Sequence, residues 1–247
     1  MKAAEEPVVN AWLSIPSSYA VESIVHQGFD AATVDCQHGM MGFEGALAML
    51  QAISTTSVVP LVRPSGLHPS EIMRYLDAGS YGIICPMIST VEDARALVSA
   101  CRYPPHGTRS FGPARGLLYG GTGYLDGANE EILVLAMIET CEGLKNLDAI
   151  LAVPGLDGIY VGPNDLSLAM GLRPANESVE PAVVDAIERT RAMTVAAGKI
   201  AGIFCSDGPA AAGRIQEGFD LVTPGNDAAL LRRVMAQAVE ETRRARV

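Results

Sequence analysis

Two acidic side chains stand just after apolar runs of the sequence, where buried strands would end. Glu139 follows ILVLAMI at 132–138, and Asp165 lies a few residues beyond DGIYV at 157–161. An isolated carboxylate beside an apolar interior is costly to keep charged, so these acids either lie at a hydrated rim or share a cation. Two carboxylates suit Mg²⁺ or Mn²⁺, with water and substrate oxygens completing the shell. Each acid alone equally fits the first turn of a helix, so both alternatives stay open.

Other polar and aromatic side chains occupy similar positions. His38 lies three residues after Asp35, close enough for the carboxylate to orient the ring of an acid–base pair, although a structural histidine fits equally well. Arg63 directly follows VVPLV at 58–62 and can hold a carboxylate or stabilise an enolate oxygen, or else form an ion pair at the rim. Trp12, the only tryptophan, either packs in the core or forms a pocket wall.

The elements that must position these residues recur along the whole chain. Eight apolar, strand-like runs alternate with eight helix-like stretches, a pattern typical of a parallel sheet. The predicted strands are 9–14, 31–36, 58–62, 82–87, 132–138, 157–161, 199–204 and 220–223. The predicted helices are 18–27, 43–53, 69–78, 91–101, 141–151, 178–197, 208–217 and 226–245.

Eight such units in 247 residues match a (β/α)8 barrel, the TIM barrel, in count and size. A doubly wound open sheet is the alternative, but no GxGxxG or GxxxxGK[ST] follows any strand, which weakens its nucleotide-binding versions. No break in composition divides the chain, so we expect a single domain over 1–247. Because chemistry in such barrels lies where the strands end, six residues are expected to converge on one mouth. They are Asp35, His38, Arg63, Glu139, Asn164 and Asp165.

The segment 102–128 is the longest irregular connection in this interpretation, with three arginines and many glycines. Long loops in compact domains are usually lids or interaction segments. Either this segment covers the rim and excludes water, or it is a surface excursion or a subunit contact.

Composition and charge exclude several classes of function. The net charge of −10 argues against a nucleic-acid binder, and no apolar run is long enough to span a membrane. The N-terminal stretch lacks the features of a signal peptide, so a cytoplasmic location is expected. Five cysteines without a CxxC make a disulfide framework or a thiolate zinc site improbable. Lys199 begins a predicted strand, at the wrong end of the barrel for Schiff-base chemistry.

Several motifs in order resemble those of the HpcH/HpaI aldolases, metal-dependent enzymes of the phosphoenolpyruvate/pyruvate barrel superfamily. The resemblance covers nearly the whole chain and is closest to the branch of hydroxy-ketoacid aldolases. Its motifs are VDCQHG at 34–39, LVRP at 61–64, LDAGSYGIICPM at 76–87, GTRSFGP at 107–113, MIET at 137–140 and GPNDLS at 162–167.

The resemblance implies a role for each of these residues. Glu139 and Asp165 would bind the metal, His38 would be the acid–base residue, and Arg63 would stabilise charge on the keto oxygen. Asp35 and Asp77 would tune or orient the histidine, one of them from a neighbouring subunit. Substrate-binding residues would be Trp12, Met137, Gly162, Asn164 and Asp165, with the backbone around 164–165 holding the pyruvate carboxylate.

Met137 departs from the family pattern, because many relatives carry a glutamine there that contacts pyruvate. We therefore expect an altered donor range. The resemblance also implies a hexamer, a trimer of dimers, with the C-terminal helix swapped between subunits, and a role in the catabolism of aromatic compounds.

The implied reaction is the reversible cleavage of a 4-hydroxy-2-oxo acid, through a metal-stabilised enolate, into an aldehyde and pyruvate or a related 2-oxo acid such as hydroxypyruvate. The metal would be Mg²⁺ or Mn²⁺; Co²⁺ or Zn²⁺ are alternatives, zinc being the weaker because both ligands are carboxylates. Two other functions stay open. One is a citrate-lyase-β or malyl-CoA-lyase-like enzyme acting on a CoA thioester, and the other is a non-catalytic barrel that binds keto acids.

Overall fold

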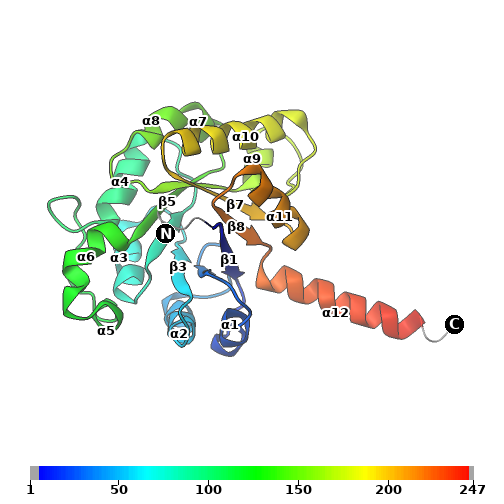
Figure 1. The fold of residues 1–247 in the computed structure, drawn as a ribbon, viewed down its shortest axis with the longest axis horizontal. Coiled ribbons are helices and arrows are strands. Elements are labelled where there is room, and N and C mark those ends of the chain that lie inside the picture. Colours follow the sequence, from blue (N-terminus) through cyan, green and yellow to red (C-terminus); the bar gives the residue numbers. More distant parts are fainter. Residues whose placement is uncertain (1–5, 245–247) are drawn as a thin grey trace.

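The computed structural model describes residues 6–244, and in it eight parallel strands close into a barrel (Figure 1). Each strand pairs with the next along the chain, and β8 pairs with β1 to complete the ring. The strands are β1 (Val8–Leu13), β2 (Ala31–Asp35), β3 (Val59–Arg63), β4 (Gly82–Cys85), β5 (Leu133–Ile138), β6 (Gly158–Val161), β7 (Ile200–Cys205) and β8 (Leu221–Pro224). The predicted fold class is confirmed.

Helices surround the strands as an outer layer (Figure 1). They are α1 (Ser18–Val25), α2 (Phe43–Ile53), α3 (Pro69–Asp77), α4 (Val91–Cys101), α5 (Gly116–Gly120), α6 (Tyr124–Glu131), α7 (Cys141–Lys145), α8 (Leu147–Leu151), α9 (Pro163–Ala169), α10 (Pro181–Ala196), α11 (Gly208–Glu217) and α12 (Asp227–Arg244). A short 3₁₀ helix, η1 (Gly121–Gly123), joins α5 to α6.

The strands are apolar on both faces because both faces are covered. Every residue of β2, β4 and β5 is buried, which explains the continuous apolar runs in the sequence. The barrel interior is filled with side chains, and a polar layer crosses it. Asn10 Nδ2 donates to Thr223 Oγ1 at 2.9 Å, the Thr33 hydroxyl donates to Asn10 Oδ1 at 3.0 Å, and the Tyr160 hydroxyl bonds Thr223 Oγ1 at 2.7 Å. These buried polar groups therefore satisfy one another.

Three predictions about the helices need correction. The stretch 141–151 is two short helices, α7 and α8, that meet at Asn146. The helix α9 was not expected, although Pro163 at its first position is well suited to begin a helix. The segment 102–128 is not irregular throughout, because it contains α5, η1 and the start of α6.

The helix α12 extends away from the body of the barrel (Figure 1). Its side chains from 231 to 244 are all exposed, including the apolar Leu231, Val234, Met235 and Val239. The helix predicted over 226–245 is thus present, but position 245 lies outside the described residues, as do 1–5 of the N-terminal stretch. No helix within 6–244 is long and apolar enough to cross a membrane. The single-domain assignment over 1–247 stays a prediction.

A buried ion pair near the amino-terminal ends of the strands gives a test of this packing. Arg102 is 4% exposed, and its Nη2 donates to Asp157 Oδ2 at 2.7 Å and to the Gly155 carbonyl at 3.0 Å. Arg102→Met should lower the free energy of unfolding by about 3 kcal/mol, because it removes a buried guanidinium that donates hydrogen bonds to a carboxylate and to backbone carbonyls. Urea unfolding followed by circular dichroism measures this change.

The matched control is Arg95→Met, which removes an exposed pair with Glu92. Its effect should stay within about 0.5 kcal/mol. Equal destabilisation by the two variants would contradict the structural importance of the buried pair.

Candidate active site

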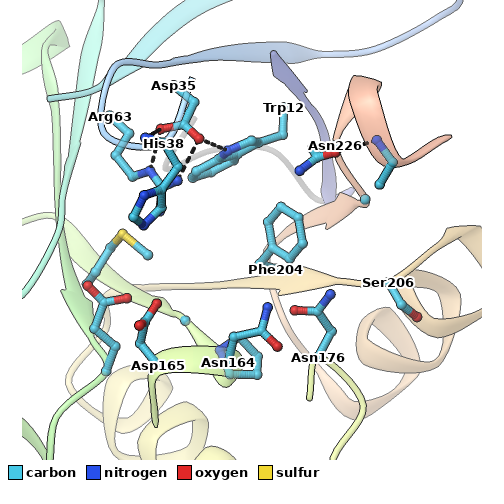
Figure 2. A pocket seen from close by; sticks show the side chains of 16 residues that line it. Trp12, Asp35, His38, Arg63, Asn164, Asp165, Asn176, Phe204, Ser206 and Asn226 are labelled. Atoms are coloured by element: carbon cyan, nitrogen blue, oxygen red, sulfur yellow. Dashed lines mark hydrogen bonds and ion pairs between the residues drawn. The ribbon is translucent and has the colours of Figure 1, made fainter. Parts of the chain in front are cut away.

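A cavity of about 210 Å³ opens at the carboxyl ends of the strands (Figure 2). Its walls come from β1, β2, β3, β5 and β7 and from the segments that follow β2, β5, β6, β7 and β8. All six residues expected to converge line it: Asp35, His38, Arg63, Glu139, Asn164 and Asp165. The predicted substrate-binding residues Trp12, Met137 and Gly162 line it as well.

Asp35 and Arg63 form a buried, doubly hydrogen-bonded pair on one side of the cavity. Arg63 Nε donates to Asp35 Oδ1 at 2.9 Å, and Nη2 donates to Oδ2 at 2.6 Å. The Trp12 indole N–H also donates to Oδ2, at 3.1 Å, and the guanidinium lies over the Trp12 ring at 4.8 Å. Burial alone would raise the pKa of Asp35, but the hydrogen bonds and positive charge of Arg63 leave it below its usual value. This pair therefore stays charged.

His38 lies at the rim of the cavity, exposed in the single chain. The carboxylate of Asp35 accepts a hydrogen bond from the His38 backbone N–H at 3.1 Å and another from the Gln37 N–H at 3.1 Å. The prediction that Asp35 orients the imidazole is thus wrong in detail. The carboxylate fixes the backbone of the turn that carries His38, while its remaining capacity is taken by Arg63 and Trp12.

Glu139, just past β5, and Asp165, in the first turn of α9, both line the cavity and interact electrostatically. Glu139 is 2% exposed, and the backbone N–H of Met87 donates to its Oε1 at 2.8 Å. Met87 adopts a φ of 59°, a left-handed conformation unusual for a residue other than glycine, and this turns its N–H toward Glu139. Removal from water, only partly offset by that N–H, acts together with the charge of Asp165 to raise the pKa of Glu139 to about 7.

The surroundings of these two carboxylates fit a divalent cation. A Cβ at Gly162 would lie 2.4 Å from Glu139 Oε2, so only glycine leaves this oxygen its space. Within the described part of the chain no group of three or more His, Cys, Asp or Glu side chains is placed to hold a metal. A cation here would therefore have two carboxylate ligands, leaving positions for water and substrate oxygens, as Mg²⁺ and Mn²⁺ accept.

The helix α9 places Asn164 and Asp165 in its first turn, after Gly162. Backbone N–H groups in a first turn have no acceptor within their own helix, and the helix dipole favours negative charge there. A small carboxylate beside Asp165 would meet these donors. Because α9 was not predicted, the sequence located the two residues but not the reason for their orientation.

Four lining residues with polar or aromatic side chains escaped sequence analysis: Asn176, Phe204, Ser206 and Asn226. Three of them lie at or just after the ends of β7 and β8, where the same rule about strand ends would have found them. Asn176 lies in the connection between α9 and α10, and no sequence signal marks it.

Asp77 and the segment 102–128 do not belong to this cavity within one chain. Asp77 ends α3 at the opposite end of the barrel, where Arg109 Nη2 donates to its Oδ1 at 3.0 Å and the Arg115 backbone N–H donates to its carbonyl at 2.9 Å. The segment connects a helix to a strand, so it lies at the amino-terminal ends of the strands and does not cover its own cavity. A contribution of Asp77 to the active site of a neighbouring subunit, where it would orient the histidine, stays a prediction.

Comparison with known proteins identifies close relatives of the chain. The family described as HpcH/HpaI aldolase/citrate lyase matches residues 9–233. The chain is 44% identical over 237 residues to a hydroxypyruvate/pyruvate aldolase of Rhizorhabdus wittichii, covering 96% of this chain and 94% of that protein. It is 37% identical over 235 residues to a 4-hydroxy-2-oxo-heptane-1,7-dioate aldolase of Salmonella paratyphi C, covering 93% of this chain and 88% of the relative.

A solved structure has the same fold. The crystal structure of an HpcH/HpaI aldolase/citrate lyase family protein from Burkholderia cenocepacia superposes with a TM-score of 0.91 at 32% identity. The match covers 98% of this chain and 96% of that one.

The raised pKa of Glu139 predicts how the stability of the metal-free protein depends on pH. The folded state holds a proton on Glu139 up to about pH 7, whereas the carboxyl of the unfolded chain has a pKa near 4.5 and releases it there. Stability from this group is complete below pH 4.5 and is lost as the pH rises through 7, by up to roughly 3 kcal/mol. Urea unfolding in EDTA at pH 5 and 7.5 should show the decline.

Glu139→Gln is the control, because a neutral amide has no proton to release. Its unfolding free energy should change much less over the same interval. A decline as steep in the variant as in the unchanged protein would contradict this assignment.

The close approach at Gly162 predicts the effect of a single methyl group. Gly162→Ala should displace the Glu139 carboxylate and weaken Mn²⁺ binding at least about tenfold, measured by electron paramagnetic resonance titration. Gly208→Ala, where an added Cβ would meet nothing within 4 Å, is the matched control. Equal Mn²⁺ affinities in the two variants would show that the space beside Glu139 does not matter.

Proposed function

Because the chain belongs to the HpcH/HpaI aldolase/citrate lyase family, we propose that it is a pyruvate-type aldolase that reversibly cleaves 4-hydroxy-2-oxo acids into a 2-oxo acid and an aldehyde. The observation that carries this proposal is the convergence of Glu139, Asp165, Arg63 and His38 on one cavity. Two acidic side chains that can hold a metal ion, a guanidinium fixed in place and an exposed imidazole are the groups that such a carbon–carbon lyase needs.

Glu139 and Asp165 are proposed to hold the divalent cation on which enzymes of this family generally depend. When bound, the cation acts as a Lewis acid that stabilises negative charge on a substrate oxygen. Its two carboxylate ligands favour Mg²⁺ or Mn²⁺, with Co²⁺ or Zn²⁺ as less suited alternatives. Binding would also neutralise the two acids, one of which is nearly excluded from water.

Arg63 and the start of α9 are proposed to fix the 2-oxo acid. The backbone N–H groups of Asn164 and Asp165 offer donors to its carboxylate. Arg63 is held in place by Asp35 and by the face of Trp12, so its charge is preorganised near the keto oxygen, where charge develops during the reaction. Asp35 therefore acts through Arg63, by keeping the guanidinium in position.

His38 is proposed to handle protons. In the cleavage direction it takes the proton of the C4 hydroxyl, the C4 carbonyl forms, and the C3–C4 bond breaks. The electron pair of that bond moves into the 2-oxo acid, whose C3 then takes up a proton. The exposed position of His38 lets it exchange protons with water between turnovers.

Met137 forms an apolar part of the wall and is 2% exposed. A thioether donates no hydrogen bond, so the donor ketone lacks an amide contact at this position. We propose that the 2-oxo acids accepted as donors extend beyond pyruvate to related compounds such as hydroxypyruvate. Hydroxypyruvate is named in the description of the relative from R. wittichii.

Two alternatives are tested by simple assays. A CoA-thioester lyase would act on malyl-CoA or citryl-CoA and not on free 4-hydroxy-2-oxo acids, so cleavage assays with both substrate types separate the two. A non-catalytic barrel would bind pyruvate in calorimetry, in a metal-dependent way, without turning over any 4-hydroxy-2-oxo acid.

The exposed apolar side chains of α12 support a proposal about assembly. An isolated helix with Leu231, Val234, Met235 and Val239 in water leaves apolar surface to be covered by another subunit. We propose the swapped-helix hexamer expected from the resemblance, and light scattering coupled to size-exclusion chromatography measures its mass.

Substitution of the proposed proton carrier and metal ligand tests the function directly. His38→Ala and Glu139→Gln should each lower kcat for cleavage by two or more orders of magnitude, since each removes a group that acts on the reacting atoms. The assay couples released pyruvate to lactate dehydrogenase.

His68→Ala is the control, because His68 precedes α3 and does not line the cavity. Its kcat should be unchanged. Near-normal rates in both His38→Ala and Glu139→Gln would remove the basis of the proposed function.

A further inference from the structure

Met87 has a backbone conformation that normally requires glycine. Among residues 6–244 it is the only residue other than glycine with a positive φ, at 59°. Its side chain is 53% exposed, so the packing of that side chain does not account for the conformation. Glycine would adopt this φ without strain, whereas another residue keeps it only where the surrounding structure imposes it. The cause therefore has to lie in the neighbours of Met87.

The conformation of Met87 serves the carboxylate of Glu139. It directs the Met87 N–H to Glu139 Oε1 at 2.8 Å, and no other described residue donates to this carboxylate. Because Oε1 is occupied in this way, Oε2, the oxygen beside Gly162, is left to face a cation. Relaxation of φ to its ordinary range would rotate the peptide unit that carries this N–H and would take it away from the carboxylate.

The chain just after Met87 is held by contacts on several sides. The Ser89 hydroxyl is hydrogen-bonded to the Thr140 hydroxyl at 2.7 Å, and it lies 3.5 Å from the Met87 carbonyl oxygen. Asn146 Nδ2 donates to the Ser89 carbonyl at 2.8 Å. The Ser89 N–H donates to Asp93 Oδ2 at 3.1 Å. Ser89 is thus fixed through its side chain, its carbonyl and its N–H.

These contacts join two neighbouring loops beside the proposed metal ligand. The loops follow β4 and β5, which pair in the barrel, and Thr140 comes directly after Glu139. Ile88, between Met87 and Ser89, is fully buried, so the chain is also held from the inside. The backbone of Met87 can therefore relax only if Ser89 moves away from Thr140.

We propose that Ser89 is a positioning residue, which holds Met87 in its strained conformation and thereby orients Glu139 for a divalent cation. This inference rests on the proposed metal site and extends it to residues outside the cavity, since neither Ser89 nor Met87 lines it. Removal of the Ser89 hydroxyl lets the strain at Met87 relax, so the N–H turns away from Glu139 and affinity for the cation falls.

A double-mutant cycle separates release of strain from an ordinary loss of packing. The dissociation constant for Mn²⁺ is measured by electron paramagnetic resonance titration of the unchanged protein, Ser89→Ala, Met87→Gly and the double variant. Ser89→Ala should weaken Mn²⁺ binding about tenfold, as is typical when a group that orients a metal ligand is lost.

Met87→Gly should change the affinity less than about twofold, because glycine keeps the N–H and accepts the same φ without strain. In the presence of Met87→Gly, the further change Ser89→Ala should cost less than about threefold, because no strain remains to drive the relaxation.

Ser99→Ala is the matched control, because it also removes a hydroxyl that bonds a threonine, Thr108, at 3.0 Å, but at the other end of the barrel. Its affinity for Mn²⁺ should equal that of the unchanged protein. Asn146→Ala, which releases the Ser89 carbonyl, should weaken binding as Ser89→Ala does. In cleavage assays of Ser89→Ala, the Mn²⁺ concentration for half-maximal rate should rise about tenfold, while kcat at saturating Mn²⁺ stays within about twofold.

An unchanged Mn²⁺ affinity in Ser89→Ala, or an equal loss with and without Met87→Gly, would overturn the positioning role of Ser89. A loss in Met87→Gly alone would also overturn it, because the effect would then come from the methionine side chain. Mn²⁺ affinities that follow the cycle, without cleavage of any 4-hydroxy-2-oxo acid, would support the role of Ser89 and reject the aldolase function. Absence of Mn²⁺ binding by the unchanged protein would reject both.

Discussion

A carboxylate removed from water beside a second carboxylate is the interaction on which this cavity depends. Glu139 is buried at the end of β5, next to Asp165, and a single backbone N–H from Met87 is the hydrogen bond donated to it. Such a group must hold a proton or a cation. Gly162 leaves the space beside Oε2 open, so a cation can approach where a side chain would block it. A cation held by these two acids would meet their electrostatic demand and the electrophilic demand of the proposed reaction at once.

On another wall of the cavity, the positive charge of Arg63 is held in a fixed position and largely shielded from water. Arg63 is 8% exposed, and Asp35 binds it through both carboxylate oxygens while Trp12 covers its face. A paired guanidinium cannot turn away toward solvent, so it costs little reorganisation when charge develops on a bound keto oxygen. Asp35 also holds the backbone of His38, which ties the proposed proton carrier and the fixed charge of Arg63 to one carboxylate.

Sequence patterns predicted the barrel because its strands are buried on both faces and therefore read as continuous apolar runs. The rule that chemistry lies at strand ends then brought Glu139, Asp165, Arg63 and His38 together correctly. What failed depended on contacts between distant segments. The partner of Asp35 could not be identified before Arg63 had a place, and Asn176 lies in a connection without any periodic signal. Of the two alternatives for the segment 102–128, a lid over its own cavity does not fit, because a helix-to-strand connection lies at the amino-terminal ends of the strands.

The wall of the cavity that follows β8 is continuous with the helix that extends from the barrel. Asn226 lines the cavity and also caps α12, whose far end extends from the barrel. The next residue, Asp227, accepts hydrogen bonds from the backbone N–H groups of Ser14 at 2.9 Å and Ile15 at 3.0 Å, which ties the start of α12 to the end of β1. This part of the cavity wall is thus fixed by contacts within one chain, whatever covers the exposed length of α12.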